Sequence, residues 1–390
     1  MDLTAAQELG FDTSRLERLR QAMLDDIARA GVDGVSLMIG RHGKLALDLV
    51  EGMADRKLGR PLDGDAVFAT FAVSKQITSV VALMFVERGL LHLHQPIVEW
   101  LPQFNVPGKE KINLYHLLTN TSGLFSHYPE CPHEDLNSIE KLTAYAARKP
   151  LEATPGERVS YSMFAVHAVI ASLCVKADGG KRTFCRIMDE ELFRPLGMRS
   201  AALGCRSDLL ERLCPVRANF TDDTALAPQV LEGLESLLRT PGGEMPGAGC
   251  LMTTSDLYRF TEMLRNGGEL DGARILSPAT MKYMLRVHSD PSMRNRIWDT
   301  SATLRNWTVW PANQGLGFWI RGEEGVPPGP IGSLMSPRAY GGFGAGSAGF
   351  WVDPEFDLSI AFLSTGLLKG YAHLERLGRL TNMIVTAVVR

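Results

Sequence analysis

The sequence predicts an α/β sheet domain joined to an all-α domain: an antiparallel sheet built from both termini and flanked by helices, with a helical domain inserted into it. Three observations predict this fold. Strand-length apolar patterns occur near both ends of the chain, helix-length patterns fill its middle, and Pro- and Gly-containing loops separate the middle patterns. We expect residues 1–70 and 270–390 to form the sheet domain, residues 71–269 to form the mainly helical domain, and an active site to lie at their junction.

The N-terminal elements are a helix and a hairpin. Residues 12–30 carry apolar side chains at three- and four-residue spacing up to Gly31, which is the pattern of an amphipathic helix that ends at a glycine. These apolar side chains are Leu16, Leu19, Met23 and Ile27. Residues 35–39 and 45–50 flank the turn-forming tetrapeptide Arg-His-Gly-Lys, which predicts a β-hairpin.

Helical patterns and a second pair of strands complete the predicted elements. The helical patterns cover residues 77–89, 139–147, 163–177 and 255–266. Residues 348–365 predict two apolar strands around an Asp-Pro turn, and a helical pattern follows over about 372–389. The C-terminal end therefore mirrors the N-terminal end, as expected if both contribute to one sheet.

Composition narrows the class of partner. The chain has 390 residues, is 45% hydrophobic, and has a net charge of −3 with a pI near 6.3, so we expect neither nucleic acid nor an anionic membrane as a partner. The polar N-terminus shows no signal-peptide pattern, and no window reaches the length of a membrane span. The six cysteines show no CxxC spacing. These features predict a soluble, cytoplasmic protein with reduced thiols.

Ala72 and Lys75 lie near the start of an apolar helix. Residues three apart share one helix face, so a serine at position 72 would point alongside Lys75. A serine hydroxyl needs a base to become a nucleophile, and a partly desolvated lysine can serve as one. This is the logic of the Ser-x-x-Lys motif. From this stretch alone, an ordinary helix lysine is the better explanation of Lys75.

Five further stretches change that interpretation. In chain order they are "HLLTNTSGL" (116–124), "TPGERVSYS" (154–162), "LFRPLGMRS" (192–200), "GAGCLMTTSDLYRFTEMLRNGG" (247–268) and "AYGGFGAGSAGFWVDP" (339–354). Together they resemble the serine β-lactamase and penicillin-binding-protein-like superfamily, and most of all class C β-lactamases and family VIII carboxylesterases. The resemblance runs from about residue 12 to the C-terminus and implies a β-lactamase/transpeptidase-like fold.

The resemblance also implies roles for individual residues. The nucleophile of the family falls at Ala72, its lysine at Lys75, and the tyrosine of its Tyr-x-Asn motif, a general base assisted by the lysine, at Tyr161. The third motif, Lys-Thr-Gly or its esterase variants, falls at the tripeptide Tyr340-Gly341-Gly342 and would bind substrate. The N–H groups of residue 72 and Phe343 would then form the oxyanion hole. The resemblance implies a small-molecule ester or amide as the substrate, and it implies no metal and no organic cofactor.

Three departures from the family pattern bear on the substrate. Ala72 has no oxygen, so no acyl-enzyme forms through it. Met163 replaces an amide side chain that binds substrate amides, and Tyr340 replaces a lysine that binds a substrate carboxylate. The last two changes favour a carboxylesterase. An amide or peptide hydrolase, a β-lactamase or an acyltransferase on the same scaffold is the alternative.

The alanine itself has two explanations. Because both bases are kept, we interpret Ala72 as an engineered serine-to-alanine substitution that inactivates the enzyme, and a natural, catalytically dead binding protein is the alternative. Ser74 lies about 200° around the helix from position 72 and does not replace the nucleophile. His127, Cys131 and His133 lie close in sequence, but no fourth ligand is evident, so we predict no metal site.

Overall fold

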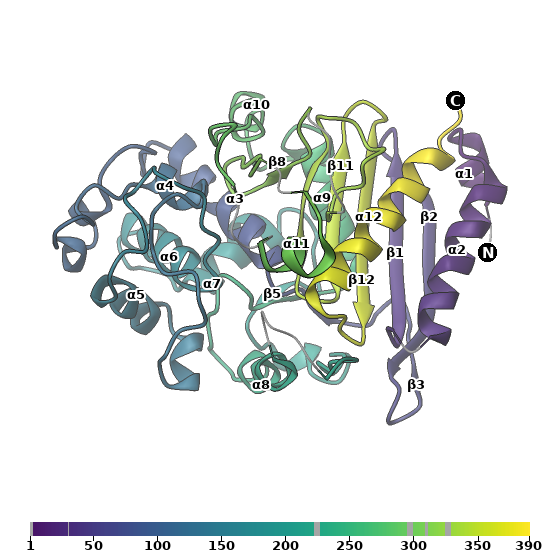
Figure 1. Ribbon diagram of the computed structural model, residues 1–390, viewed down its shortest axis with the longest axis horizontal. Coiled ribbons are helices and arrows are strands. Elements are labelled where there is room, and N and C mark those ends of the chain that lie inside the picture. Colours follow the sequence, from purple (N-terminus) through teal and green to yellow (C-terminus); the bar gives the residue numbers. More distant parts are fainter. Residues whose placement is uncertain (1–2, 30, 222–226, 295–298, 309–310, 324–328) are drawn as a thin grey trace.

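Both ends of the chain meet in one seven-stranded antiparallel sheet. The computed structural model describes residues 3–29, 31–221, 227–294, 299–308, 311–323 and 329–390 (Figure 1). The strand order is β3-β2-β1-β12-β11-β10-β9, and β1 (Gly34–Arg41) pairs along its whole length with β12 (Leu358–Thr365). The N-terminal and C-terminal strands are thus neighbours at the centre of the sheet, which confirms the predicted fold class.

The two predicted hairpins are present. The turn between β1 and β2 (Lys44–Asp55) has positive φ at His42 and Gly43, the backbone that a tight hairpin turn requires. β11 (Ala348–Asp353) and β12 pair across the predicted Asp-Pro turn. Local turn chemistry and strand-length runs of apolar residues therefore suffice to specify these elements.

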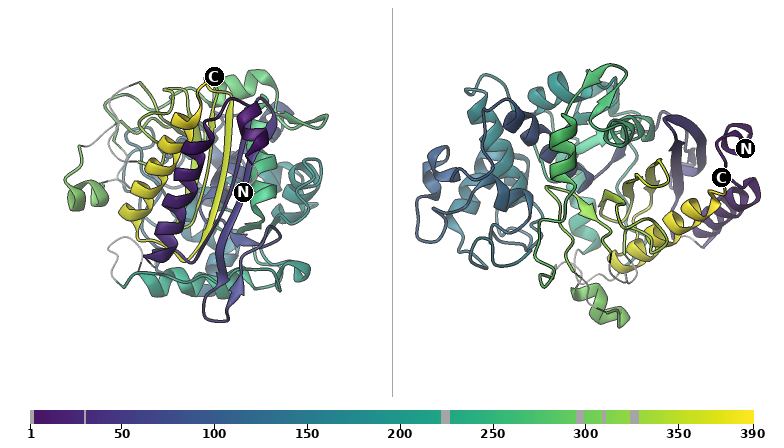
Figure 2. Two further views of the ribbon diagram at one scale, coloured as in Figure 1. Left: turned by 90° about the vertical axis from the view of Figure 1, so that its right-hand side faces the viewer. Right: turned by 90° about the horizontal axis from the view of Figure 1, so that it is seen from above.

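Helices cover both faces of the sheet. On one face, α2 (Thr13–Ala28) and α12 (Gly370–Ala387) lie side by side, as Figure 2 shows. α9 (Thr254–Arg265) packs on β1, β11 and β12 from the other face. The predicted boundary at 269/270 assigns α9 to the helical domain, whereas its packing joins it to the sheet. The domain boundaries stay a prediction.

The remaining elements complete the sheet domain and form the helical region and its connections. The helices are α1 (Thr4–Glu8), α3 (Val73–Glu87), α4 (Leu114–Leu118), α5 (Ile139–Arg148), α6 (Ala165–Ala177), α7 (Phe184–Met188), α8 (Pro228–Leu238), α10 (Pro278–Met284), α11 (Asp299–Arg305) and a π-helical turn, η4 (Asp189–Phe193). The short strands are β3 (Arg60–Pro61), β4 (Phe68–Ala69), β5 (Ala202–Leu203), β6 (Cys250–Met252), β7 (Glu269–Leu270), β8 (Ala273–Arg274), β9 (Trp319–Ile320) and β10 (Tyr340–Gly344). Among the helices in the described part of the chain, none has the length and apolar character that a membrane span needs.

α3 lies where the two parts of the molecule meet. It contacts α6 on one side and β10 and β11 on the other, and almost all of its side chains are buried. A helix enclosed in this way is fixed in position by packing rather than by its intrinsic propensity. The residues at its N-terminus are therefore held rigidly between the sheet and the helical region.

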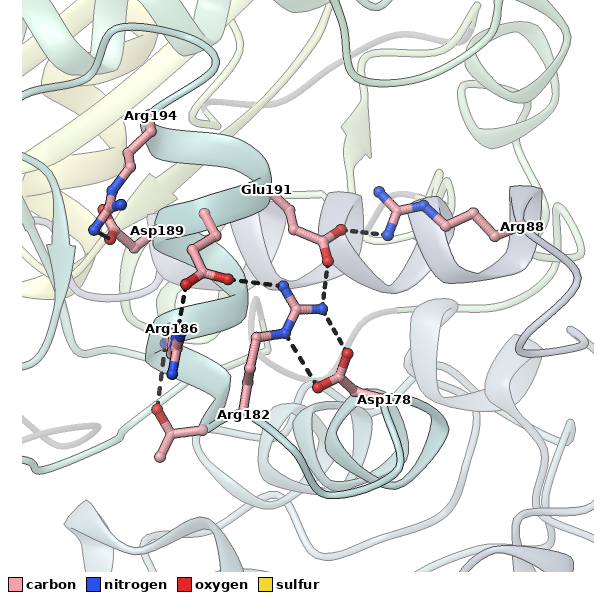
Figure 3. Close-up of polar contacts among 9 residues, drawn as sticks. Arg88, Asp178, Arg182, Arg186, Asp189, Glu191 and Arg194 are labelled. Carbon is pink, nitrogen blue, oxygen red and sulfur yellow. Dashed lines mark hydrogen bonds and ion pairs between the residues drawn. The ribbon is translucent and has the colours of Figure 1, made fainter.

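An ion-pair network fixes the other end of α3. The Arg182 guanidinium binds Asp178 and Glu191 as well as Glu190, and Glu191 also pairs with Arg88, which follows the last residue of α3 (Figure 3). The network joins the end of α6 to the π-helical turn and to α3. Its acidic members Asp178 and Glu191 are largely shielded from solvent, so the pairs are screened less than exposed ones.

Candidate active site

Ala72 occupies a sharp turn between a strand and a helix. β4 ends at Ala69, and Phe71 then adopts a φ of +44°, a region that bulky side chains rarely enter. Ala72 follows as the N-cap residue of α3, with helical backbone angles. A strained residue beside a helix N-terminus is typical of a functional position, because the surrounding structure must hold it there.

Lys75 is buried beneath Ala72, on the first turn of α3. Its side chain is 3% exposed, and its nitrogen donates hydrogen bonds to the carbonyl oxygens of Met163 (2.7 Å) and Gly247 (2.6 Å). Burial lowers the pKa of Lys75 to about 7. At neutral pH a large fraction of Lys75 is therefore a neutral amine. Its two N–H bonds are taken by the two carbonyls, and its lone pair is left to accept a proton.

Tyr161 lies next to Lys75. The Lys75 nitrogen is 5.0 Å from the centroid of the Tyr161 ring, although the two residues are far apart in sequence. Burial raises the pKa of the Tyr161 phenol above its ordinary value. The phenol therefore stays protonated at neutral pH, and Lys75 is the stronger candidate for the base.

The stretch 116–124 supports the loop that carries Tyr161. Ser160 N donates to the Asn120 carbonyl (2.8 Å), and Gly156 N donates to the Thr121 carbonyl (2.7 Å). Asn120 has a φ of +56°, which turns the chain sharply between these two contacts. Direct backbone hydrogen bonds thus join the stretch 116–124 to the stretch 154–162.

The hydroxyl group of Ser74 has a structural partner. Its side chain is fully buried, and its hydroxyl oxygen accepts a hydrogen bond from Cys250 N (2.9 Å). The contact joins α3 to β6. The Ser74 hydroxyl is thus engaged in holding β6 against α3, and its exclusion as the nucleophile stays a prediction.

The glycines of β10 allow the strand to approach α3. A Cβ on Gly342 would overlap the Gln76 side chain, and a Cβ on Gly344 would overlap the Thr70 carbonyl and lie 3.2 Å from Ala72 N. Gly341 faces the opposite side, toward Trp351. The strand therefore passes the backbone of Ala72 at Gly344, two residues after the tripeptide 340–342 that the resemblance indicates.

The side chain of Tyr340 does not reach Lys75. It is buried, its hydroxyl donates to the Leu264 carbonyl of α9 (3.1 Å), and its ring lies edge-on to Phe318. This placement makes Tyr340 part of the core between the sheet and α9. Its side chain brings neither charge nor hydrogen-bonding capacity to the surroundings of Ala72.

A row of three aromatic rings begins at Tyr161. The Tyr161 ring stacks on Trp319 with a centroid separation of 6.1 Å, and Trp319 lies 6.3 Å from Phe343. Because aromatic faces bury large apolar areas, this row favours an apolar group in the substrate. The part played by Trp319 carries no sequence motif and was not predicted.

The sequence also did not predict which groups surround Lys75. The carbonyls of Met163 and Gly247 bind its nitrogen, and a Cβ on Gly247 would lie 3.3 Å from that nitrogen. His167 on α6 is buried close to Gly247, and burial, with the nearby Lys75 charge, lowers its pKa well below the ordinary value. The glycine in "GAGC" was the one sequence signal for this contact, because every residue has a main-chain carbonyl and the sequence does not show which carbonyls bind Lys75.

The histidines considered for a metal have other partners. His127 pairs with Glu152 (3.1 Å), and a ring nitrogen of His133 lies 3.0 Å from the Gly233 carbonyl. Within the ranges that the structure describes, no three His, Cys, Asp or Glu side chains are grouped to hold a metal ion.

Comparisons with known proteins identify the family of the chain. The Beta-lactamase family model matches residues 18–381. The Esterase/beta-lactamase LipL of Mycobacterium tuberculosis is 27% identical over 363 residues, which cover 86% of this chain and 78% of LipL. Esterase EstB of Burkholderia gladioli is 30% identical over 208 residues, which cover 48% of this chain and 52% of EstB.

A solved structure shows the same fold. A penicillin-binding-protein homologue from Caulobacter crescentus superimposes with a TM-score of 0.76 over 96% of this chain and 97% of the homologue, at 21% sequence identity. The predicted resemblance and the predicted fold are both confirmed.

Proposed function

Because the chain belongs to the Beta-lactamase family of serine hydrolases, we propose that it has the scaffold of a carboxylesterase. In this proposal Ala72 occupies the position of the nucleophile. The observation that carries the proposal is the buried Lys75, three residues after Ala72, with a pKa of about 7. A buried amine with this pKa is suited to accept the proton of a serine hydroxyl at neutral pH.

The proposed mechanism proceeds through an acyl-enzyme. The hydroxyl of a serine at position 72 loses its proton to Lys75, directly or by way of Tyr161, and its oxygen attacks the ester carbonyl. The proton then passes through the neutral Tyr161 phenol to the departing alcohol. A water molecule releases the acid by the same steps and restores the serine.

The proposed oxyanion hole combines two backbone amides. One is the N–H of residue 72, and the other comes from the end of β10, at Phe343 as the resemblance implies or at Ala345. The close approach of Gly344 to Ala72 N supports this location. Two donors at this point would stabilise the negative charge of the tetrahedral intermediate.

Two features support an ester substrate. Met163 provides no side-chain amide for a substrate amide group, and Tyr340 is turned into the core, so the tripeptide 340–342 offers no cation to a substrate carboxylate. The names of LipL and EstB both contain the word esterase. Because LipL is also named a β-lactamase, β-lactam or amide hydrolysis is the second candidate function.

Ala72 makes the chain inactive in this proposal. The strained turn at Phe71, the buried Lys75 and the glycines of β10 are all kept, which supports an engineered serine-to-alanine substitution over a natural loss. A natural, catalytically dead binding protein is the rival, and the codon at position 72 in the gene distinguishes the two. A cytoplasmic location is also proposed, and the six unpaired cysteines support it.

The Ala72→Ser variant tests the function. We expect it to hydrolyse short p-nitrophenyl esters with burst kinetics, while the Ala72 chain shows only background hydrolysis. Nitrocefin and a D-amino-acid peptide are assayed in parallel, since faster turnover of either would favour the amide-directed alternative. No hydrolysis of any of the three substrates above background would refute the proposal.

A further inference from the structure

A buried pair on α12 holds the turn that follows β10. His373 and Arg376 are 2% and 4% exposed. The His373 Nε2–H donates to the Gly344 carbonyl (2.9 Å), and Arg376 Nη2 donates to the Gly346 carbonyl (3.1 Å). The chain reverses between Gly344 and β11, so two carbonyls of this short turn, those of Gly344 and Gly346, are bound by side chains of α12.

The pair is also joined internally. Arg376 Nη2 lies 3.3 Å from His373 Nδ1 and 3.0 Å from Ser364 Oγ on β12. Because Nε2 donates to a carbonyl and Nδ1 accepts from a guanidinium, the partners assign the neutral Nε2–H tautomer to His373. Burial and the Arg376 charge lower the pKa of His373 well below its ordinary value, so the pair keeps one hydrogen-bonding pattern.

The turn held in this way is the part of the sheet closest to Ala72. Gly344, whose carbonyl binds His373, is the residue whose Cβ would lie 3.2 Å from Ala72 N. The Gly344 carbonyl and the Ala345 N–H belong to one planar peptide unit, so a hydrogen bond to the carbonyl fixes the direction of that N–H. It also polarises the unit, which strengthens the N–H as a donor.

Arg376 is unusual for a purely structural residue. Its Nε and Nη1 have no hydrogen-bond partner, and no carboxylate in the described ranges forms an ion pair with it. Its charge is offset by the field of Asp26 and by the face of the Phe362 ring, whose centroid lies 5.1 Å from the guanidinium carbon. A buried cation that no carboxylate contacts within the described ranges costs desolvation free energy, and apolar residues in its place are often neutral or stabilising. Stability alone therefore gives little reason for an arginine here, whereas orientation of the turn does.

We propose that His373 and Arg376 are positioning residues that orient the backbone amides at the end of β10 toward the oxyanion formed at residue 72. The inference rests on the proposed function in its catalytic part. The hydrogen bond to the Gly344 carbonyl acts directly on the Ala345 N–H, which shares its peptide unit, and acts on the Phe343 N–H only through the intervening Gly344 backbone.

The catalytic test uses the Ala72→Ser background. His373→Phe removes the donor and keeps a ring, His373→Gln keeps a donor, and Arg376→Met removes the second tie. We expect His373→Phe and Arg376→Met to lower kcat by about 10- to 100-fold with KM within about twofold, the signature of lost oxyanion stabilisation. His373→Gln should recover most of kcat. Arg379→Met, an exposed arginine on the same helix, is the matched control and should change neither constant.

A second measurement needs no activity. In the Ala72 chain, we expect His373→Phe and Arg376→Met to speed amide hydrogen exchange in residues 343–347, with exchange in α6 unchanged. If Ala72→Ser is inactive, the proposed function fails, and the exchange experiment alone decides whether the pair holds the turn. Unchanged exchange at 343–347, or a rise in KM with kcat retained, would overturn the inference. Should His373→Phe fail to fold, His373→Gln and Arg376→Met supply the same comparison.

Discussion

The Lys75 side-chain nitrogen lies 5.0 Å from the centroid of the Tyr161 ring, and burial moves the pKa values of these two groups in opposite directions. The amine becomes easier to deprotonate and the phenol harder. The resemblance implies Tyr161 as the base, whereas the surroundings of the two groups favour Lys75 as the acceptor of the serine proton. This relationship leads to the first two predictions.

The activity of the Ala72→Ser variant should depend on the protonation of Lys75. We expect kcat/KM for a p-nitrophenyl ester to rise from pH 5.5 through about pH 7 and then level off, because the neutral amine is the active form. Lys75→Arg in the same background keeps a cation that cannot act as a base, so kcat/KM should fall by about 10²- to 10⁴-fold. A profile that is flat from pH 5.5 to 8.5 would contradict the assignment.

Lys75 should also make stability depend on pH in the chain as it stands. The unfolded chain keeps the Lys75 proton up to about pH 10.5 and the folded chain loses it near pH 7, so the unfolded state binds more protons between these values and stability rises with pH. Relative to Lys75→Met, the free energy of unfolding should rise by about 4 to 5 kcal/mol from pH 7 to pH 10.5. Urea denaturation of both proteins at several pH values measures it, and a constant difference would show that Lys75 has an ordinary pKa.

Ser74→Ala should affect stability but not catalysis. The substitution leaves the buried Cys250 N–H without its acceptor, which should lower the free energy of unfolding by about 1 to 3 kcal/mol. In the Ala72→Ser background, kcat/KM should stay within about threefold. Loss of activity to the level of the Ala72 chain would instead identify Ser74 as a nucleophile.

Gly344→Ala should disturb the site from the side of the sheet. Its Cβ would overlap the Thr70 carbonyl and push β10 away from Ala72 N, so kcat of the Ala72→Ser variant should fall by about tenfold or more. Gly64→Ala is the matched control, because a Cβ at Gly64 meets no atom within 4 Å. Equal activity of the two variants would mean that β10 does not contribute to the oxyanion hole.

Arg182→Met should separate stability from activity. The substitution removes the ion-pair partner of Asp178 and leaves Glu191 paired with Arg88 alone, and we expect a loss of about 2 to 4 kcal/mol in the free energy of unfolding. Arg194→Met removes an exposed pair with Asp189 and should cost less than about 1 kcal/mol. Chemical denaturation compares the two, and the Ala72→Ser activity should be unaffected in both. A similar loss in both variants would show that the network has no special stability.

The sequence by itself determined the local elements. The amphipathic helix before the first hairpin, the Asp-Pro hairpin and the spacing of Ala72 and Lys75 follow from periodicity and turn chemistry within a few residues. Resemblance to a known family also gave Tyr161 as the partner of Lys75, since its motif is a fixed set of residue types.

Only the tertiary structure decided how these residues work. The hydrogen-bond acceptors of Lys75 are the main-chain carbonyls of Met163 and Gly247, and residue types in the sequence do not identify such acceptors. The alternation of side chains along β10 turns Tyr340 toward α9 and brings Gly344 close to Ala72 N. A shift of the strand register by one residue would turn both residues to the opposite face of the sheet. The pKa of Lys75 follows from burial by distant segments, because desolvation is set by everything packed around a group and not by its sequence neighbours.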